Sequence, residues 1–299
     1  MTVCLAAIAE RSKAIVMVSD KAVTYGEKDS LAPMQYDTDV KKVRQIGNTL
    51  WYALIAGDPT FALQVIEGTE KILVNRPDLS KSVDGMMNAL KAAYKKRRES
   101  LVNDLVLSPR LLTKELLVAR PSELLPLDRE FFVEISDEAK SLRTNSSLLV
   151  CGFDTSFQPH IFSVVSPGVV KNHDMTGFHA VGIGATMAIS RLLVLESLKE
   201  DSLPLALYQA FDSKVNAEVM QGVGYNWDAE ILVSGKKAVE VPGSVRNLVE
   251  SVYECLPLTP LLLRKRQKER KYPKEWKSRL DTFCNRVMRG ARRSSRRNV

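Results

Sequence analysis

Residues 2–24 read Thr-Val-Cys-Leu-Ala-Ala-Ile-Ala-Glu-Arg-Ser-Lys-Ala-Ile-Val-Met-Val-Ser-Asp-Lys-Ala-Val-Thr, and they contain the clearest structural signal in the chain. An apolar run from Val3 to Ala9 and a β-rich run from Ala14 to Val18 flank a polar turn. Two such runs joined by a short polar segment predict an antiparallel hairpin. The hairpin carries a carboxylate, Asp20, at its far end.

Thr2 has a side-chain hydroxyl and a backbone nitrogen on neighbouring carbons. Methionine aminopeptidases remove an initiator Met when the next residue is small, so we expect the mature chain to begin with Thr2. A free α-amine has a pKa of about 7.7–8.0, so part of it is unprotonated at neutral pH and can take the hydroxyl proton. Thr2 is therefore a candidate for both nucleophile and base, although many chains begin Met-Thr without any catalytic role.

Further features follow the hairpin in a fixed order. Asp39-Val40-Lys41-Lys42-Val43 comes after a loop, and an apolar strand from Leu50 to Ile55 then runs into Ala56-Gly57-Asp58 and a helix. This order resembles the N-terminal part of proteasome β-type subunits and their bacterial relatives, which are N-terminal-nucleophile (Ntn) hydrolases.

The second half of the chain is similar to the same family at two segments. Gly177 to Ala188 resembles the glycine-containing segment that opens the family's third helix. Glu218 to Val233 resembles the end of the fourth helix, its glycine-rich turn and the next strand. The resemblance covers about residues 2–67 and 147–241, roughly half of the chain.

The resemblance implies a catalytic set of Thr2, Asp20, Lys42 and the backbone N–H of Gly57. A lysine near the α-amine of Thr2 would lower the pKa of that amine by like-charge repulsion. Lys42 matches that position and Asp20 matches the carboxylate that holds it, whereas Lys41 should point to the opposite face of its strand. Outside the family pattern, the same residues could form a surface ion pair, and Gly57 could lie in an ordinary strand-to-helix turn.

Three positions depart from the family pattern. Ile183 lies between Gly182 and Gly184, where many active members have a Ser. Glu218 and Gln221 occupy positions where those members have an Asp and a Ser. Glu218 shares a helix face with Phe211 and Val215, so we expect it to point inward, with the Thr2 amine as a candidate partner.

The expected fold is α+β: a four-layer αββα Ntn-hydrolase sandwich of two antiparallel sheets with helices on both outer faces. Alternating pairs of strands and helices along the chain favour such layers. The strands Ser147 to Phe153 and His160 to Val165 form a second hairpin. The expected helices are Thr60 to Leu73, a helix capped by Ser80 that runs to about Val102, Ala185 to Leu198, and Leu203 to Met220.

Two regions lie outside the resemblance. Residues 105–145 form an expected helical insertion in a domain that spans residues 1–263. Residues 264–299 form a basic tail with 15 Lys and Arg against 3 Asp and Glu, a net charge of +12, whereas the preceding residues carry 28 against 32. Such a tail could bind a polyanion or a partner protein, or it could be a solvated appendage. Trp276 and Phe283 at helical spacing predict that part of it folds and docks.

Composition favours a cytoplasmic protein without a transmembrane segment, because 26% of the residues are charged and no apolar stretch is long enough to span a bilayer. The four cysteines, Cys4, Cys151, Cys255 and Cys284, are expected to be reduced thiols, with Cys4 as a rival nucleophile. The three histidines lack metal-ligand spacing, so we expect no metal or other cofactor.

The sequence thus predicts a homo-oligomeric threonine amidohydrolase, most simply a peptidase that acts on a peptide or amide substrate. Two alternatives remain open at this point. The first is a catalytically silent proteasome-like scaffold subunit. The second is a binding protein that acts through its basic tail.

Overall fold

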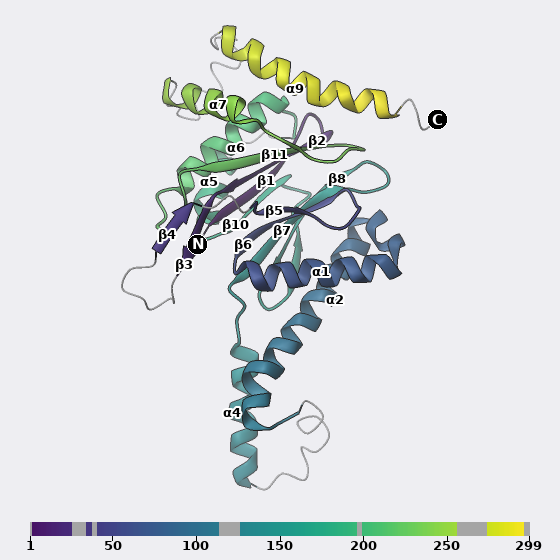
Figure 1. Ribbon diagram of the computed structural model, residues 1–299, viewed down its shortest axis with the longest axis vertical. Coiled ribbons are helices and arrows are strands. Elements are labelled where there is room, and N and C mark those ends of the chain that lie inside the picture. The colour runs from purple at the N-terminus through teal and green to yellow at the C-terminus, as the bar shows by residue number, and fades with distance from the viewer. Residues whose placement is uncertain are drawn as a thin grey trace.

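The structure, a computed structural model, describes residues 2–25, 34–37, 41–113, 126–195, 199–255 and 274–295. Within these ranges the protein is a mixed α+β structure with two antiparallel five-stranded sheets and seven α-helices (Figure 1). None of the described helices is long and apolar enough to cross a membrane.

The first sheet contains both strands of the N-terminal hairpin. Its strand order is β10-β1-β2-β11-β12, and every neighbouring pair is antiparallel. All seven residues of β1 and all seven of β2 are buried, which explains why these runs are continuously apolar rather than alternating. The strands are β1 (Val3–Ala9), β2 (Ala14–Asp20), β10 (Phe178–Gly182), β11 (Trp227–Val233) and β12 (Val239–Glu240).

The second sheet is built around the other predicted hairpin. Its order is β5-β6-β7-β8-β9, again antiparallel throughout. Its strands are β5 (Val43–Gln45), β6 (Trp51–Gly57), β7 (Ser146–Phe153), β8 (Pro159–Val165) and β9 (Val169–Asn172). A separate two-stranded ribbon joins β3 (Ala22–Tyr25) to β4 (Met34–Asp37).

The two five-stranded sheets share a buried apolar cluster. Ala6 and Ile15 of the first sheet belong to the same cluster as Leu54 and Leu149 of the second. Burial of such side chains stabilises the fold by about 25 cal/mol for each Å² of apolar surface removed from water. The inner faces of both sheets are therefore held by one core.

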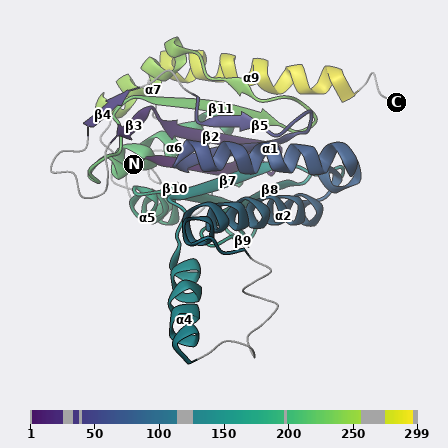
Figure 2. The same cartoon turned by 60° about the horizontal axis from the view of Figure 1, so that its bottom comes forward.

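Helices pack against each sheet and bury its remaining apolar residues. Helices α1 (Pro59–Asn75) and α2 (Val83–Val102) pack on each other and contact β6, β7 and β8 (Figure 2). Helices α5 (Ala185–Leu195) and α6 (Leu203–Ala217) likewise pack on each other and contact β1, β2 and β10. Helix α7 (Gly243–Cys255) contacts α6.

Two of the predicted helix boundaries were wrong. Ser82, not Ser80, caps α2, because its Oγ accepts the backbone N–H of Gly85 at 3.1 Å, while Ser80 lies in a preceding 3₁₀ turn, Pro77–Lys81. Helix α6 ends at Ala217 rather than Met220, and the side chain of Val219 is exposed.

The expected insertion contains helix α4 (Pro126–Ser141), which projects away from both sheets in Figure 1. The end of α2 continues as a π-helical turn, Asn103–Leu107, and a 3₁₀ turn, Ser108–Arg110. A small cluster of Val106, Leu107 and Ile135 joins these turns to α4. Residues 114–125 lie outside the described part of the chain, and the role of this region stays a prediction.

The basic tail contains helix α9 (Lys274–Ser295), which contacts α6, α7 and β11. Leu280, Cys284 and Val287 of α9 are buried in the same cluster as the apolar residues of β1, β2 and α6. Phe283 packs against this cluster, so part of the tail folds and docks as its helical spacing predicts. The side chain of Trp276 and residues 256–273 lie outside the described residues.

Leu280→Ala should lower the free energy of unfolding by about 2–5 kcal/mol, because it removes a fully buried side chain and leaves a cavity under α9. Arg286→Ala on the exposed face of the same helix is the matched control and should change this energy by less than about 0.5 kcal/mol. Urea denaturation followed by circular dichroism measures both variants. Superimposable curves for the two variants would contradict the docking of α9.

Candidate active site

Thr2 lies immediately before β1 and is 4% exposed. Its Oγ1 donates a hydrogen bond to Asp20 Oδ1 and accepts one from Lys42 Nζ. Thr2, Asp20 and Lys42 are far apart in the sequence. Antiparallel pairing of β1 with β2 brings the start of β1, next to Thr2, beside the end of β2, where Asp20 lies. The hydroxyl is thus held between a carboxylate and an ammonium group.

Asp20 is the end of β2, and its side chain has no solvent exposure. Besides Thr2, its Oδ1 accepts the backbone N–H of Val3 at 3.0 Å and Lys42 Nζ at 2.8 Å. Its Oδ2 accepts the backbone N–H of Gly224 at 2.9 Å. Four donors from three other segments of the chain therefore satisfy this buried charge and fix the direction of both oxygens.

Lys42 reaches the same point from the residue before β5. Its side chain is 9% exposed, and its Nζ also donates to the carbonyl of Ala22 at 2.7 Å. The carbonyl of Lys42 accepts the N–H of Ile55 at 3.0 Å, which ties its backbone to β6.

Lys41 points elsewhere, and its Nζ pairs with Glu240 at 2.5 Å on the surface. The expected opposite directions of Lys41 and Lys42 are confirmed. Both residues nevertheless precede the strand rather than lie within it, because β5 begins at Val43.

Gly57 ends β6 with φ of +91°, a conformation that side chains strongly disfavour. A Cβ at this position would lie 1.8 Å from the carbonyl oxygen of Asn145. Backbone N–H groups alternate along a strand, and the N–H of Ile55 points toward Lys42. The N–H of Gly57, two residues further on, is therefore directed to the Lys42 side of β6, just ahead of the Asp58 cap of α1.

Gly182 and Gly184 allow the chain to approach Thr2 closely. A Cβ on Gly182, whose φ is +100°, would lie 2.2 Å from the carbonyl oxygen of Thr2. The N–H of Gly184 donates to the same oxygen at 3.5 Å. Ile183, between them, has its side chain 43% exposed and gives the site no hydroxyl.

Glu218 has a different partner from the one expected. It follows the end of α6, and its carboxylate accepts a hydrogen bond from Lys214 Nζ at 2.5 Å. Burial raises the pKa of Glu218, and the ion pair with Lys214 offsets part of that rise. Its carboxylate is therefore engaged by Lys214 rather than by Thr2. Gln221 is exposed.

Lys214 is the residue of this region that the sequence interpretation missed. Its side chain is fully buried, and its Nζ also donates to the carbonyl of Tyr225. The available signal was its position on the apolar face of α6, three residues from Phe211 and seven from Leu207.

Cys4 is excluded as the nucleophile by its surroundings. Its thiol is fully buried and donates to the carbonyl of Ile55 at 3.3 Å. Burial raises the pKa of the thiol to about 12, so the thiolate is not populated near neutral pH. Cys151 and Cys284 are also free and buried, whereas the side chain of Cys255 is outside the described residues.

His160 is on β8, His173 follows β9 and His179 is on β10. His173 and His179 stack with ring centroids 3.5 Å apart, and His160 Nδ1 lies 2.7 Å from Asp174 Oδ2. Within the described ranges, no group of three or more His, Cys, Asp or Glu side chains is arranged to hold a metal ion.

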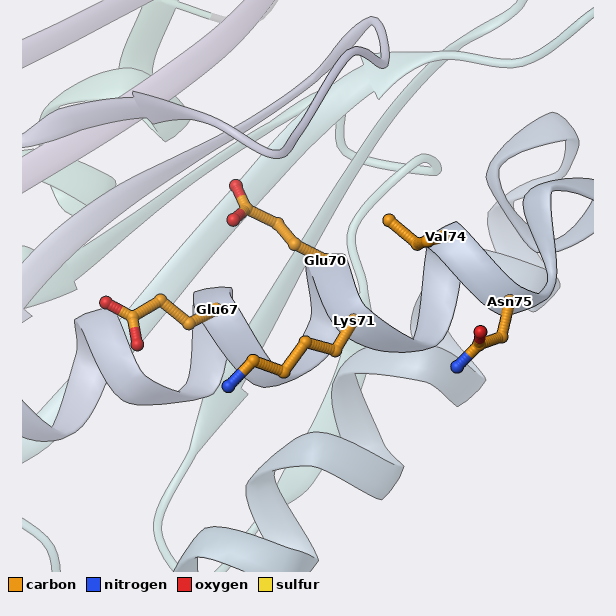
Figure 3. A pocket seen from close by; sticks show the side chains of 5 residues that line it. All are labelled: Glu67, Glu70, Lys71, Val74 and Asn75. Atoms are coloured by element: carbon orange, nitrogen blue, oxygen red, sulfur yellow. The ribbon is translucent and has the colours of Figure 1, made fainter.

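A surface hollow lies along the outer side of α1, away from the residues above. Figure 3 shows that all five of its lining side chains belong to this helix: Glu67, Glu70, Lys71, Val74 and Asn75. Glu70 also accepts the N–H of Gly47, so the hollow borders the turn between β5 and β6. Thr2, Asp20 and Lys42 do not line it.

No protein-family model matches this chain, and no curated protein matches its sequence. A threonine hydroxyl between a lysine and a carboxylate is suited to nucleophilic attack, because the cation stabilises an alkoxide and the carboxylate orients both partners.

Proposed function

We propose that this protein is an N-terminal-nucleophile amidohydrolase, similar to proteasome β-type subunits, in which Thr2 attacks a peptide or amide carbonyl. The observation that carries the proposal is the contact of Thr2 Oγ1 with both Lys42 Nζ and Asp20 Oδ1. These are the three residues that the sequence resemblance selects, and they come together from three separate segments of the chain.

The arrangement of the elements supports the same family. We infer a four-layer αββα sandwich, with α1 and α2 outside the β5–β9 sheet and α5 and α6 outside the sheet that contains β1. The shared core between the sheets and the separate clusters under each helix pair agree with this order of layers. In such a fold Thr2 lies at the open end of the sheet that contains β1.

In the proposed reaction, Thr2 Oγ1 adds to the carbonyl carbon and its proton passes to the α-amine of Thr2. The amine must therefore be free, which requires removal of Met1. The proton then goes to the leaving amine as the C–N bond breaks and an ester to Thr2 forms. Water hydrolyses the ester and restores the hydroxyl.

The remaining groups stabilise charge during these steps. Lys42 carries a positive charge beside Oγ1, and Asp20 holds that ammonium at 2.8 Å. The backbone N–H of Gly57 is assigned to the oxyanion of the tetrahedral intermediate, because it is directed to the Lys42 side of β6 and no Cβ blocks the approach. None of these roles needs a metal or an organic cofactor.

A catalytically silent scaffold subunit is the main competing proposal, because Ile183 supplies no hydroxyl and Glu218 is paired with Lys214. The contacts of Thr2, Asp20 and Lys42 favour an active enzyme over that alternative, since a silent subunit has no need to hold a buried hydroxyl between two charges. Binding of a polyanion through the tail also stays a prediction.

The proposal is tested by treating the protein with a peptide epoxyketone, which closes a ring only with a hydroxyl and a free α-amine on the same residue. Intact-mass measurement should show loss of Met1 before treatment and one adduct after it. Peptide mapping should place the adduct on Thr2. Protein that retains Met1 in the cell, or an adduct on another residue, would overturn the proposed function.

A further inference from the structure

Lys214 is a lysine with no solvent exposure on the inner side of α6. Burial lowers the pKa of its ammonium group, and hydrogen bonding to Glu218 offsets part of that decrease. Replacing a buried ion pair by apolar side chains is often neutral or stabilising, so stability alone is a weak reason for this pair. A second reason for the pair is the segment that the Lys214 ammonium group holds in place.

The second partner of Lys214 is the carbonyl of Tyr225, in the segment that follows α6. After Ala217 the chain makes two successive turns, with N–H bonds from Met220 to Ala217 and from Val223 to Met220 at 3.0 and 3.1 Å. Gly222, with φ of +96°, lies within the second of these turns. The segment 218–226 thus folds back on the end of α6, and Lys214 binds it at the carbonyl of Tyr225.

The residues on either side of that carbonyl bond to the site. The N–H of Gly224 donates to Asp20 Oδ2 at 2.9 Å, and the carbonyl of Asn226 accepts the N–H of Lys21 at 2.9 Å. Asp20 Oδ1 then faces Thr2 and Lys42. A continuous series of polar contacts therefore runs from Lys214 through the 218–226 segment to the carboxylate that orients the nucleophile.

We propose that Lys214 is a positioning residue, which fixes the 218–226 segment so that Gly224 holds Asp20 in the orientation required by Thr2 and Lys42. Glu218 is the counterion of this lysine rather than a group that contacts the substrate. The inference rests on the proposed hydrolytic function of Thr2. In this arrangement Glu218, at the position where the family pattern has an Asp, pairs with Lys214.

Loss of the ammonium group should release the segment without removing any group that touches the substrate. Gly224 would then no longer be held against Oδ2, and the Asp20 carboxylate could rotate away from Thr2. Displacement of a reacting group by about 1 Å can lower a rate by about 100-fold. The defect should therefore be seen in kcat, with little change in KM.

The test uses Lys214→Met in the full chain, with Arg191→Met as the matched control. Arg191 also forms a largely buried ion pair with α6, through Asp212 at 2.6 Å, and Asp212 lies on α6 before the 218–226 segment begins. Lys214→Met should lower kcat by about 10- to 100-fold, and it should speed hydrogen exchange of peptides that span 218–226. Arg191→Met should change neither measurement.

If Lys214→Met does not fold, Lys214→Met with Glu218→Met removes both charges and should restore stability, yet it should remain slow. Faster exchange in 218–226 with wild-type kcat would overturn the positioning role, and so would unchanged exchange. If the wild-type protein is not labelled at Thr2 by the epoxyketone, the proposed function itself fails. A wild-type protein that is labelled, together with a Lys214→Met variant labelled at the same rate, would overturn this inference alone.

Discussion

Thr2→Ala should abolish peptide hydrolysis, with kcat/KM falling by about 1,000-fold or more, because it removes the attacking oxygen. The fold should survive, since Asp20 keeps the ion pair with Lys42 and the backbone N–H bonds from Val3 and Gly224. Release of a fluorophore from a panel of peptide amides measures the loss. Thermal unfolding shows whether the variant is folded at the assay temperature.

Thr2→Ser is the matched control for this experiment, because it keeps Oγ and loses only a methyl group. It should retain measurable hydrolysis and epoxyketone labelling, whereas Thr2→Ala should show neither. Activity of Thr2→Ala close to that of the wild-type protein would mean that the nucleophile lies elsewhere. Cys4 would not explain such a result, since its buried thiol has a pKa of about 12.

Lys42→Ala should lower kcat/KM by about 100-fold or more, because it removes the cation that contacts the Thr2 hydroxyl. Lys41→Ala should change it less than about twofold, because the Lys41 side chain pairs with Glu240 on the surface. The same fluorogenic assay compares the neighbouring variants. Equal activities of Lys42→Ala and Lys41→Ala would show that the Lys42 ammonium group does not take part in the reaction.

Stability must be measured alongside activity for Lys42→Ala. Asp20 has no exposed side-chain surface, and removing its only side-chain cation in the described structure could cost about 3–5 kcal/mol. Lys41→Ala should cost less than about 1 kcal/mol, because surface pairs contribute little. Assays are therefore run below the unfolding transition of both variants, so that a lower rate reports on chemistry rather than on unfolded protein.

Several elements could be predicted because their signals are local. The continuous apolar runs of β1 and β2 indicate buried strands. Thr2, Asp20 and Lys42 were grouped on the resemblance to proteasome β-type subunits rather than on a local signal, and the three residues do contact one another. The opposite directions of Lys41 and Lys42 were predicted from adjacent positions on a strand, although both residues precede β5. These signals depend on residue type and spacing, which the sequence contains.

Other features depend on contacts that spacing does not encode. Ser80 and Ser82 are both acceptable caps, and only the 3₁₀ turn before α2 selects Ser82. Lys214 binds a backbone carbonyl, that of Tyr225, so no side chain in the sequence marks its partner. The Thr2 amine was the candidate partner of Glu218, although Lys214 lies four residues earlier, at the spacing of neighbours on a helix face, and this signal is present in the sequence.

The close fit of Gly182 against the carbonyl of Thr2 has a consequence for mutational scanning of this protein. A side chain at Gly182 would meet the Thr2 carbonyl oxygen at 2.2 Å and would displace Thr2, the proposed nucleophile. Gly57 is constrained in the same way by Asn145. A scan scored by activity alone would therefore rank these glycines with the reactive side chains, although neither contributes a side-chain atom to the chemistry. Loss of activity on substitution at these two glycines would therefore report a clash with the backbone rather than the loss of a reacting group.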